Sequence, residues 1–140
     1  MGNSWSDTAP EGYIPPRFPS LSWPPYEKPD RLYYLSDIVR HTTLWTLSIF
    51  ILVHLGAAGL ALTMHLGKRW SNWKYVWAVP IAYTLVAGSE AVLSGSIVGL
   101  ILGAVYRSGS LVMSTWVPFT WGWINVLVLI ISSFSIQGGL

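Results

Sequence analysis

The stretch HTTLWTLSIFILVHLGAAGLALTMHLG, from His41 to Gly67, decides the class of this chain. It contains no Asp, Glu, Lys or Arg over its whole length. A helix needs only about 20 predominantly apolar residues to cross the hydrocarbon core of a bilayer. A small water-soluble core would not require so long an uncharged segment. The segment therefore predicts a membrane-spanning helix.

Two more segments of the same kind follow, and the composition agrees with them. Hydrophobic residues make up 52% of the chain and charged residues only 10%. At ~1.5 Å per residue, the second segment is long enough to tilt or to kink near Pro80. We expect an all-α integral membrane protein whose transmembrane domain covers residues 41–140, with helices at about 41–67, 76–105 and 116–136.

Residues 1–40 differ from the rest because they hold seven of the nine prolines. Proline interrupts helices and donates no hydrogen bond to a sheet, so we expect a proline-rich, extended or disordered arm with an interfacial run-in to the first helix. Its aromatic residues either dock on a partner or lie at the lipid interface, and the alternative is a solvated leader. Before Arg40 there is no apolar core of a cleavable signal peptide, so the first span is expected to act as the targeting signal.

The charges flanking the spans do not settle the orientation. Lys68, Arg69 and Lys74 lie in one loop, and the other side holds a similar number of basic residues, Lys28, Arg31, Arg40 and Arg107. Only basic residues count in the positive-inside rule, so the two sides are nearly equal. Tryptophans predict interfacial belts at both faces: Trp45, Trp116, Trp121 and Trp123 at one, and Trp70, Trp73 and Trp77 at the other.

Glu90 is the single full charge between Tyr75 and Tyr106. An ionised glutamate near mid-membrane costs roughly 3 kcal/mol, so it should be neutral, paired or in contact with water, and His54 is the candidate partner. One hypothesis is a polar track for a proton, an ion or a lipid headgroup, formed by His54, Glu90, Ser94 and Asn125. The alternative is that these side chains only cross-link helices, through hydrogen bonds of about 1 kcal/mol each.

Small residues recur at every fourth position of the second predicted helix. A four-residue spacing of Gly and Ala lets helix backbones approach closely within lipid. We interpret this stripe as a helix-packing surface formed by Ala91, Gly95, Gly99 and Gly103.

Several function classes find no support in the residues. The chain has no cysteine, which excludes disulfides and thiolate metal sites. It also lacks the HExxH and GxSxG patterns and a phosphate-binding glycine loop. We expect a protein that is not an enzyme and has no cofactor and no metal, and a net charge of +2 is too small to suggest nucleic acid.

Three short motifs, in this order, resemble the transmembrane protein 170 family. The first helix carries a histidine followed by Ala-Gly-Leu, the second ends in Val-Tyr-Arg, and a Pro-Phe pair stands at the entry to the third. The resemblance covers about residues 37–140, and neither the arm nor Glu90 belongs to its pattern. The matching residues include His54, Gly59, Tyr106, Arg107, Pro118 and Phe119.

The resemblance implies a small protein of the endoplasmic reticulum or nuclear envelope membrane, linked to membrane shape and to phospholipid scrambling beside bridge-like lipid-transfer proteins. It also implies a lumenal N-terminus and a cytosolic C-terminus, although the chain has no Asn-x-Ser/Thr site. We therefore expect a lipid scramblase subunit whose partners are phospholipids and a lipid-transfer protein. The alternatives are a non-catalytic structural or membrane-shaping subunit that anchors or assembles a larger membrane complex and, third, proton or ion transport along His54 and Glu90.

Overall fold

A computed structural model of the chain describes residues 9–23, 30–65 and 78–137. In this part of the chain, three long helices follow one another: α1 (Leu35–His65), α3 (Ala78–Ser108) and α4 (Trp116–Gln137). All three are long and apolar enough to cross a membrane. The expected class, an all-α membrane protein, is confirmed for the described residues. The basic loop and Trp70, Trp73 and Trp77 lie outside them.

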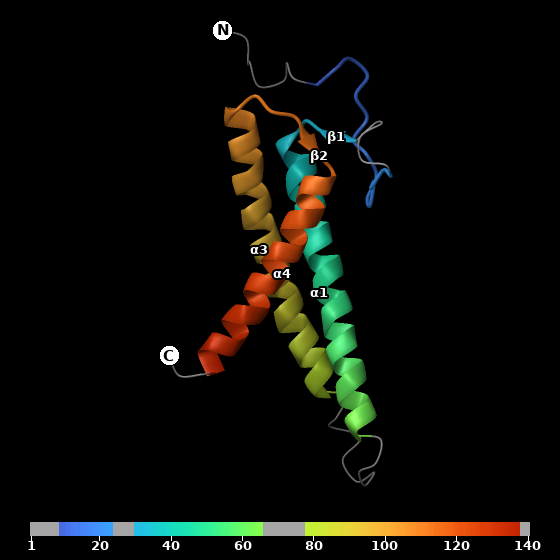
Figure 1. Cartoon of the computed structure of the whole chain (residues 1–140), viewed down its shortest axis with the longest axis vertical. Coiled ribbons are helices and arrows are strands. Elements are labelled where there is room, and N and C mark those ends of the chain that lie inside the picture. Colours follow the sequence, from blue (N-terminus) through green and yellow to red (C-terminus); the bar gives the residue numbers. More distant parts are fainter. Residues whose placement is uncertain (1–8, 24–29, 66–77, 138–140) are drawn as a thin grey trace.

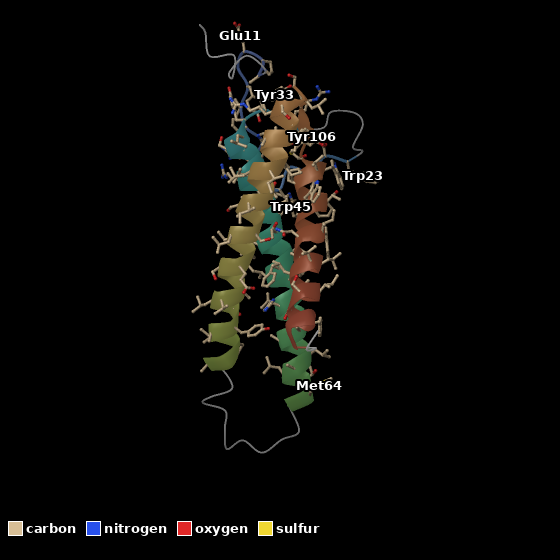
Figure 2. The ribbon with its side chains drawn as sticks, turned by 90° about the vertical axis from the view of Figure 1, so that its left-hand side faces the viewer. Glu11, Trp23, Tyr33, Trp45, Met64 and Tyr106 are labelled. Atoms are coloured by element: carbon tan, nitrogen blue, oxygen red, sulfur yellow. The ribbon has the colours of Figure 1, made fainter. Side chains whose placement is uncertain are left out.

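The helices run side by side along the long axis of the molecule (Figure 1), and α1 packs against both α3 and α4. The start of α1, the end of α3 and the start of α4 lie at one end, which we call the arm end. In Figure 1, α4 inclines away from α1 in its second half. Figure 2 places Tyr33, Tyr106 and Trp23 towards the arm end and Met64 at the opposite end.

The first helix begins at Leu35, six residues before the position expected from the uncharged run. Its first turn is closed by the carbonyl of Tyr34, which accepts hydrogen bonds from the backbone N–H groups of Asp37 and Ile38. The carboxylate of Asp37, in this first turn, also interacts favourably with the helix dipole. The helix therefore begins before the uncharged run does, because a charged residue such as Asp37 is compatible with its first turn.

A short antiparallel pair of strands lies at the arm end. Strand β1 (Arg31–Leu32) pairs with β2 (Met113–Ser114), with Leu32 opposite Met113. Leu32 and Met113 are fully buried and pack with Ile38 and Leu102 in one hydrophobic cluster. The pair connects the residues before α1 with those before α4.

The end of α3 is a helix-terminating turn with a residue in the left-handed conformation. The N–H of Leu111 donates to the carbonyl of Tyr106, and the N–H of Ser110 donates to that of Arg107. These two bonds define a Schellman motif, in which the left-handed position is usually glycine. Here Ser110 occupies it, with a φ of 53°.

The described part of the arm, residues 9–23, packs on the protein's own arm end, an arrangement the sequence did not indicate. The ring of Phe18 lies 4.9 Å from that of Trp45, centroid to centroid. The hydroxyl of Thr115 donates to the carbonyl of Ser20 at 2.8 Å, and the indole N–H of Trp116 donates to that of Ser22 at 3.3 Å.

Tyr13 anchors the beginning of this described arm. Its hydroxyl donates to the carbonyl of Arg31 at 2.9 Å, and its ring meets that of Tyr33 edge-on at 4.8 Å. Burial, with a smaller contribution from the negative charge of Asp37, raises the pKa of Tyr13 to about 12. The phenol therefore keeps its proton, and the hydrogen bond, throughout the physiological pH range.

Candidate functional site

Hydroxyl groups follow one face of α1 through the buried part of the molecule. Thr42 and Thr46 are both fully buried. The hydroxyl of Thr42 donates to the carbonyl of Ile38, and that of Thr46 donates to the carbonyl of Thr42, each at 2.8 Å. Bonding to the preceding turn lets a hydroxyl sit in an apolar environment without an unsatisfied donor.

Asn125 connects these hydroxyls to the other two helices. Its Nδ2 group, on α4, donates to Oγ1 of Thr46 on α1 at 3.4 Å. Its Oδ1 atom accepts a hydrogen bond from Oγ of Ser94 on α3 at 2.5 Å. Asn125 is only 6% exposed, so one buried amide joins α1, α3 and α4.

The small-residue stripe of α3 lies against the backbone of α1. A Cβ atom on Gly95 would stand 2.9 Å from Cα of Thr43, and one on Gly99 would stand 2.8 Å from Cα of Val39. Real Cβ atoms essentially never come so close to a backbone atom. Ala91 is fully buried one turn earlier, and Gly103 meets the side chain of Leu35. The stripe therefore brings α3 close enough to α1 for Thr43 and Ser96 to be 3.3 Å apart, hydroxyl to hydroxyl.

His54 and Glu90 are not brought together. The imidazole of His54 stacks between Phe50 (centroids 4.4 Å apart) and Tyr83 (5.5 Å). Glu90 is exposed on α3, and within the described residues no hydrogen bond or ion pair joins the two. The candidate pairing is therefore not formed in this structure, in which the imidazole stacks on two aromatic rings and Glu90 is exposed.

Glu90 nevertheless shares a side of α3 with two residues that contact the neighbouring helices. Positions 83, 90 and 94 fall on one stripe of a helix with 3.6 residues per turn. Tyr83 reaches His54 of α1, and Ser94 reaches Asn125 of α4. Along α3, position 90 thus lies between these two contact positions. The carboxylate, the hydroxyl and the amide on this side of α3 can each form hydrogen bonds with a polar molecule.

The residues that carry the family resemblance have separate positions. Pro118 is fully buried near the start of α4, and Phe119 meets Trp45 edge-on at 4.8 Å. Tyr106 and Arg107 belong to the last turns of α3, at the arm end. Gly59 is exposed in the second half of α1, and a Cβ atom added there would have no other atom within 4 Å. These residues do not form one site.

Sequence reasoning missed several buried residues. His41 is 2% exposed, and its Nδ1 group donates to the carbonyl of Asp37 at 2.9 Å. Gly122 lies under α1, where a Cβ atom would stand 3.0 Å from Cβ of Trp45. The four-residue spacing of Thr42 and Thr46, and the three-residue spacing of Gly122 and Asn125, were available as signals of one inward-facing side on each helix.

The described residues contain no group of three or more His, Cys, Asp or Glu side chains that could hold a metal ion. The polar side chains of the candidate track are the imidazole of His54, the carboxylate of Glu90, the hydroxyl of Ser94 and the amide of Asn125. Such groups can hydrogen-bond a passing polar molecule.

The fold and these contacts define a small multi-pass membrane protein built on glycine-mediated helix packing. The family model described as transmembrane protein 170A/B-like matches residues 31–140. The chain belongs to this family. It is also 35% identical, over 134 residues, to Uncharacterized protein YPR153W of Saccharomyces cerevisiae, covering 94% of this chain and 92% of the yeast protein. No solved structure matches the chain.

Proposed function

We propose that the chain is a scramblase-type subunit of the endoplasmic reticulum membrane, which lets phospholipid headgroups cross beside a bridge-like lipid-transfer protein. The observation that carries the proposal is the position of Glu90. It is exposed on α3, 12 residues after Ala78 and 18 before Ser108, between flanking residues that face lipid. Leu85 is 71% and Leu93 64% exposed.

An ionised carboxylate in this position costs roughly 3 kcal/mol unless water or a polar group reaches it. A hydrated headgroup that follows α3 would meet Glu90 first and then the hydroxyl of Ser94 and the amide of Asn125. Each contact would replace part of the headgroup's hydration, which lowers the barrier to crossing. No chemical bond is made or broken, so the proposed role is transport and not catalysis.

The proposed lipid-transfer partner explains why lipid exchange between leaflets would be needed. A lipid-transfer protein that delivers or removes lipid at one leaflet leaves the two leaflets unequal in number. A scramblase beside it restores the balance. We therefore place phospholipids and the lipid-transfer protein together as partners of this chain.

The test is lipid exchange between leaflets in reconstituted vesicles, measured with a fluorescent phospholipid and a membrane-impermeant quencher. Glu90→Leu should slow exchange per folded molecule about fivefold or more, which corresponds to about 1 kcal/mol of added barrier. Ser89→Leu is the matched control, because Ser89 is exposed beside Glu90 and its hydroxyl bonds only to its own helix. Equal rates for the two variants would contradict the role of Glu90.

A structural subunit is the second candidate, and the position of His54 favours it. His54 contacts two rings of its own chain, and Asn125 is satisfied within the bundle, as helix cross-links would be. In this case Glu90→Leu and His54→Leu should change thermal stability and leave any exchange rate per folded molecule unchanged. If the parent protein shows no exchange above mock vesicles, with or without its partner, the scramblase proposal fails and the structural role replaces it.

A further inference from the structure

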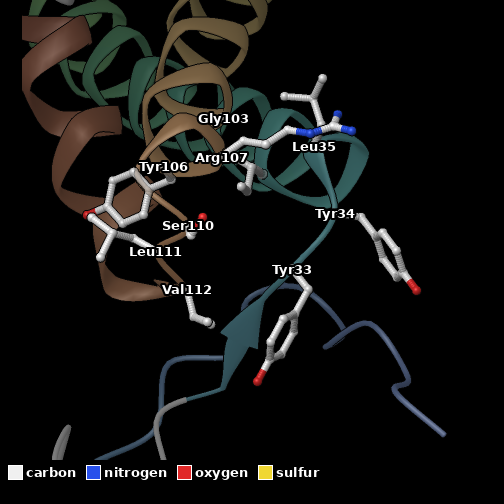
Figure 3. A pocket seen from close by; sticks show the side chains of 10 residues that line it. Tyr33, Tyr34, Leu35, Gly103, Tyr106, Arg107, Ser110, Leu111 and Val112 are labelled. Atoms are coloured by element: carbon white, nitrogen blue, oxygen red, sulfur yellow. The ribbon is translucent and has the colours of Figure 1, made fainter. Parts of the chain in front are cut away.

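A cavity of about 190 Å³ lies at the arm end, between the first turn of α1 and the last turns of α3. Figure 3 shows the side chain of Arg107 reaching from α3 towards Leu35, with Tyr33 and Tyr34 on the opposite rim. Ser110, Leu111 and Val112 close a third side. None of the lining residues belongs to the polar track of His54, Glu90, Ser94 and Asn125.

The charge of the cavity selects an anion. Arg107 is the one charged residue among those that line it, and the lining contains no carboxylate. A guanidinium presents several N–H donors in a planar fork that matches the oxygens of a phosphate group. Arg107 belongs to the last turn of α3, and its side chain is exposed.

The remaining lining is amphipathic and lies where lipid headgroups are found. Leu35, Ile38 and Leu111 provide an apolar side, and Leu111 is 63% exposed. Tyrosine concentrates at membrane–water interfaces, where the ring contacts apolar groups and the hydroxyl contacts water. Tyr33 and Tyr34 therefore place the rim at headgroup depth. The volume accommodates a phosphate and its nearest atoms, whereas acyl chains would continue along the exposed apolar surface.

Two backbone features shape the walls of the cavity. Gly103 forms part of the wall, and a Cβ atom there would overlap the side chain of Leu35. The wall opposite begins at Ser110, which keeps a left-handed backbone at a cost of about 1–2 kcal/mol for a residue with a Cβ. A residue held in such a conformation is a reason to look for a function at that place.

We infer that this cavity binds the phosphate ester of a phospholipid headgroup, with Arg107 as the phosphate ligand and Leu111 and Val112 beside the glycerol and acyl chains. A lipid bound here would occupy a fixed position at the arm end, whether or not the protein exchanges lipids between leaflets. The site is thus an addition to the proposed function and does not depend on it.

The binding experiment uses the full chain in an uncharged maltoside detergent and a fluorescent acyl-labelled phosphatidylcholine. Arg107→Gln should weaken binding about tenfold, since a charge-assisted hydrogen-bonded contact is lost. Arg40→Gln, which removes another exposed charge from α1 outside the cavity, should leave binding unchanged. Diacylglycerol with the same label should bind at least about tenfold more weakly than the phospholipid, because it lacks the phosphate that Arg107 would contact.

A second pair of variants keeps the test decisive if Arg107→Gln does not fold. Val112→Trp fills the cavity from its rim and should abolish binding, whereas Val105→Trp, on the 57% exposed Val105 outside the lining, should not. Equal binding of phospholipid and diacylglycerol, or equal effects within either pair of variants, would overturn the inference. Displacement of the phospholipid by millimolar inorganic phosphate would assign the site to free phosphate and would equally overturn a lipid site.

Discussion

The hydroxyl of Ser94 donates a hydrogen bond to Oδ1 of Asn125, and this 2.5 Å contact joins α3 to α4 in the interior of the bundle. The same amide donates to Thr46 of α1 through its nitrogen. Ser94 and Asn125 belong to the polar track and also hold the helices together. A substitution at either position is therefore expected to affect stability, so the proposed role in lipid exchange has to be measured per folded molecule.

Asn125→Leu should lower the free energy of unfolding by about 1–2 kcal/mol, because it removes two interhelical hydrogen bonds and leaves the hydroxyl of Ser94 without its partner. Reversible unfolding in detergent measures the change. Ser89→Ala is the control, since that hydroxyl bonds to the carbonyl of Val86 in its own helix. An Asn125→Leu protein as stable as the parent would contradict a structural role for the amide.

Gly95→Leu and Gly99→Leu should each lower stability by about 3 kcal/mol or reduce the yield of folded protein, because overpacking forces α3 away from the backbone of α1. Gly88→Leu should be nearly neutral, because Gly88 lies on the same helix with no atom within 4 Å of an added Cβ. Thermal unfolding and size-exclusion elution profiles measure the stability and the folded yield of the three variants. If all three variants behave alike, the stripe does not set the distance between the helices.

Thr115→Val should speed trypsin cleavage after Arg17, because the arm loses the hydrogen bond that the Thr115 hydroxyl donates to the carbonyl of Ser20. The cleavage site itself is unchanged. Thr120→Val removes a hydroxyl that bonds only to the carbonyl of Trp116 in its own helix, and should leave the cleavage rate at that of the parent. Unchanged cleavage of the Thr115 variant would mean that this bond does not hold the arm in place.

Ser110→Gly should raise the free energy of unfolding by about 1 kcal/mol, since glycine adopts a positive φ without the steric cost that a Cβ imposes. Ser108→Gly should have the opposite sign, because Ser108 is the last residue of α3 and glycine lowers helix stability. Chemical unfolding of both variants checks the signs. A destabilised Ser110→Gly protein would show that the serine side chain stabilises the fold by more than the strained backbone destabilises it.

The orientation can be tested with engineered glycosylation sites. We expect the arm in the lumen, with the 67–75 loop and the C-terminus in the cytosol, so a site inserted in the arm should be modified and one in the loop should not. A site in the turn at Gly109 and Ser110 should behave like the arm, because the end of α3 lies at the arm end. Modification of the loop site alone would reverse the assignment.

The sequence predicted the helices well and their contacts only in part. Long uncharged runs predict spans because a bilayer imposes a length and excludes charge. The end expected for the third span, at residue 136, differs by one residue from the end of α4 at Gln137. The first helix starts earlier than predicted because interfacial charges such as Asp37 are compatible with a helix whose first turn lies outside the hydrocarbon.

The sequence by itself determined that this protein spans a membrane, where the spans lie, and that α3 carries a stripe of small residues, because each property depends on residues close together in the chain. Only the tertiary structure decided which polar side chains meet. His54 and Glu90 each lie in the central part of a long helix, yet the packing of the helices places His54 against two aromatic rings and leaves Glu90 exposed. The contacts of Asn125 with Thr46 and Ser94 depend on how each helix is rotated about its axis. Packing between segments far apart in the sequence sets this rotation, so no local sequence pattern predicts it.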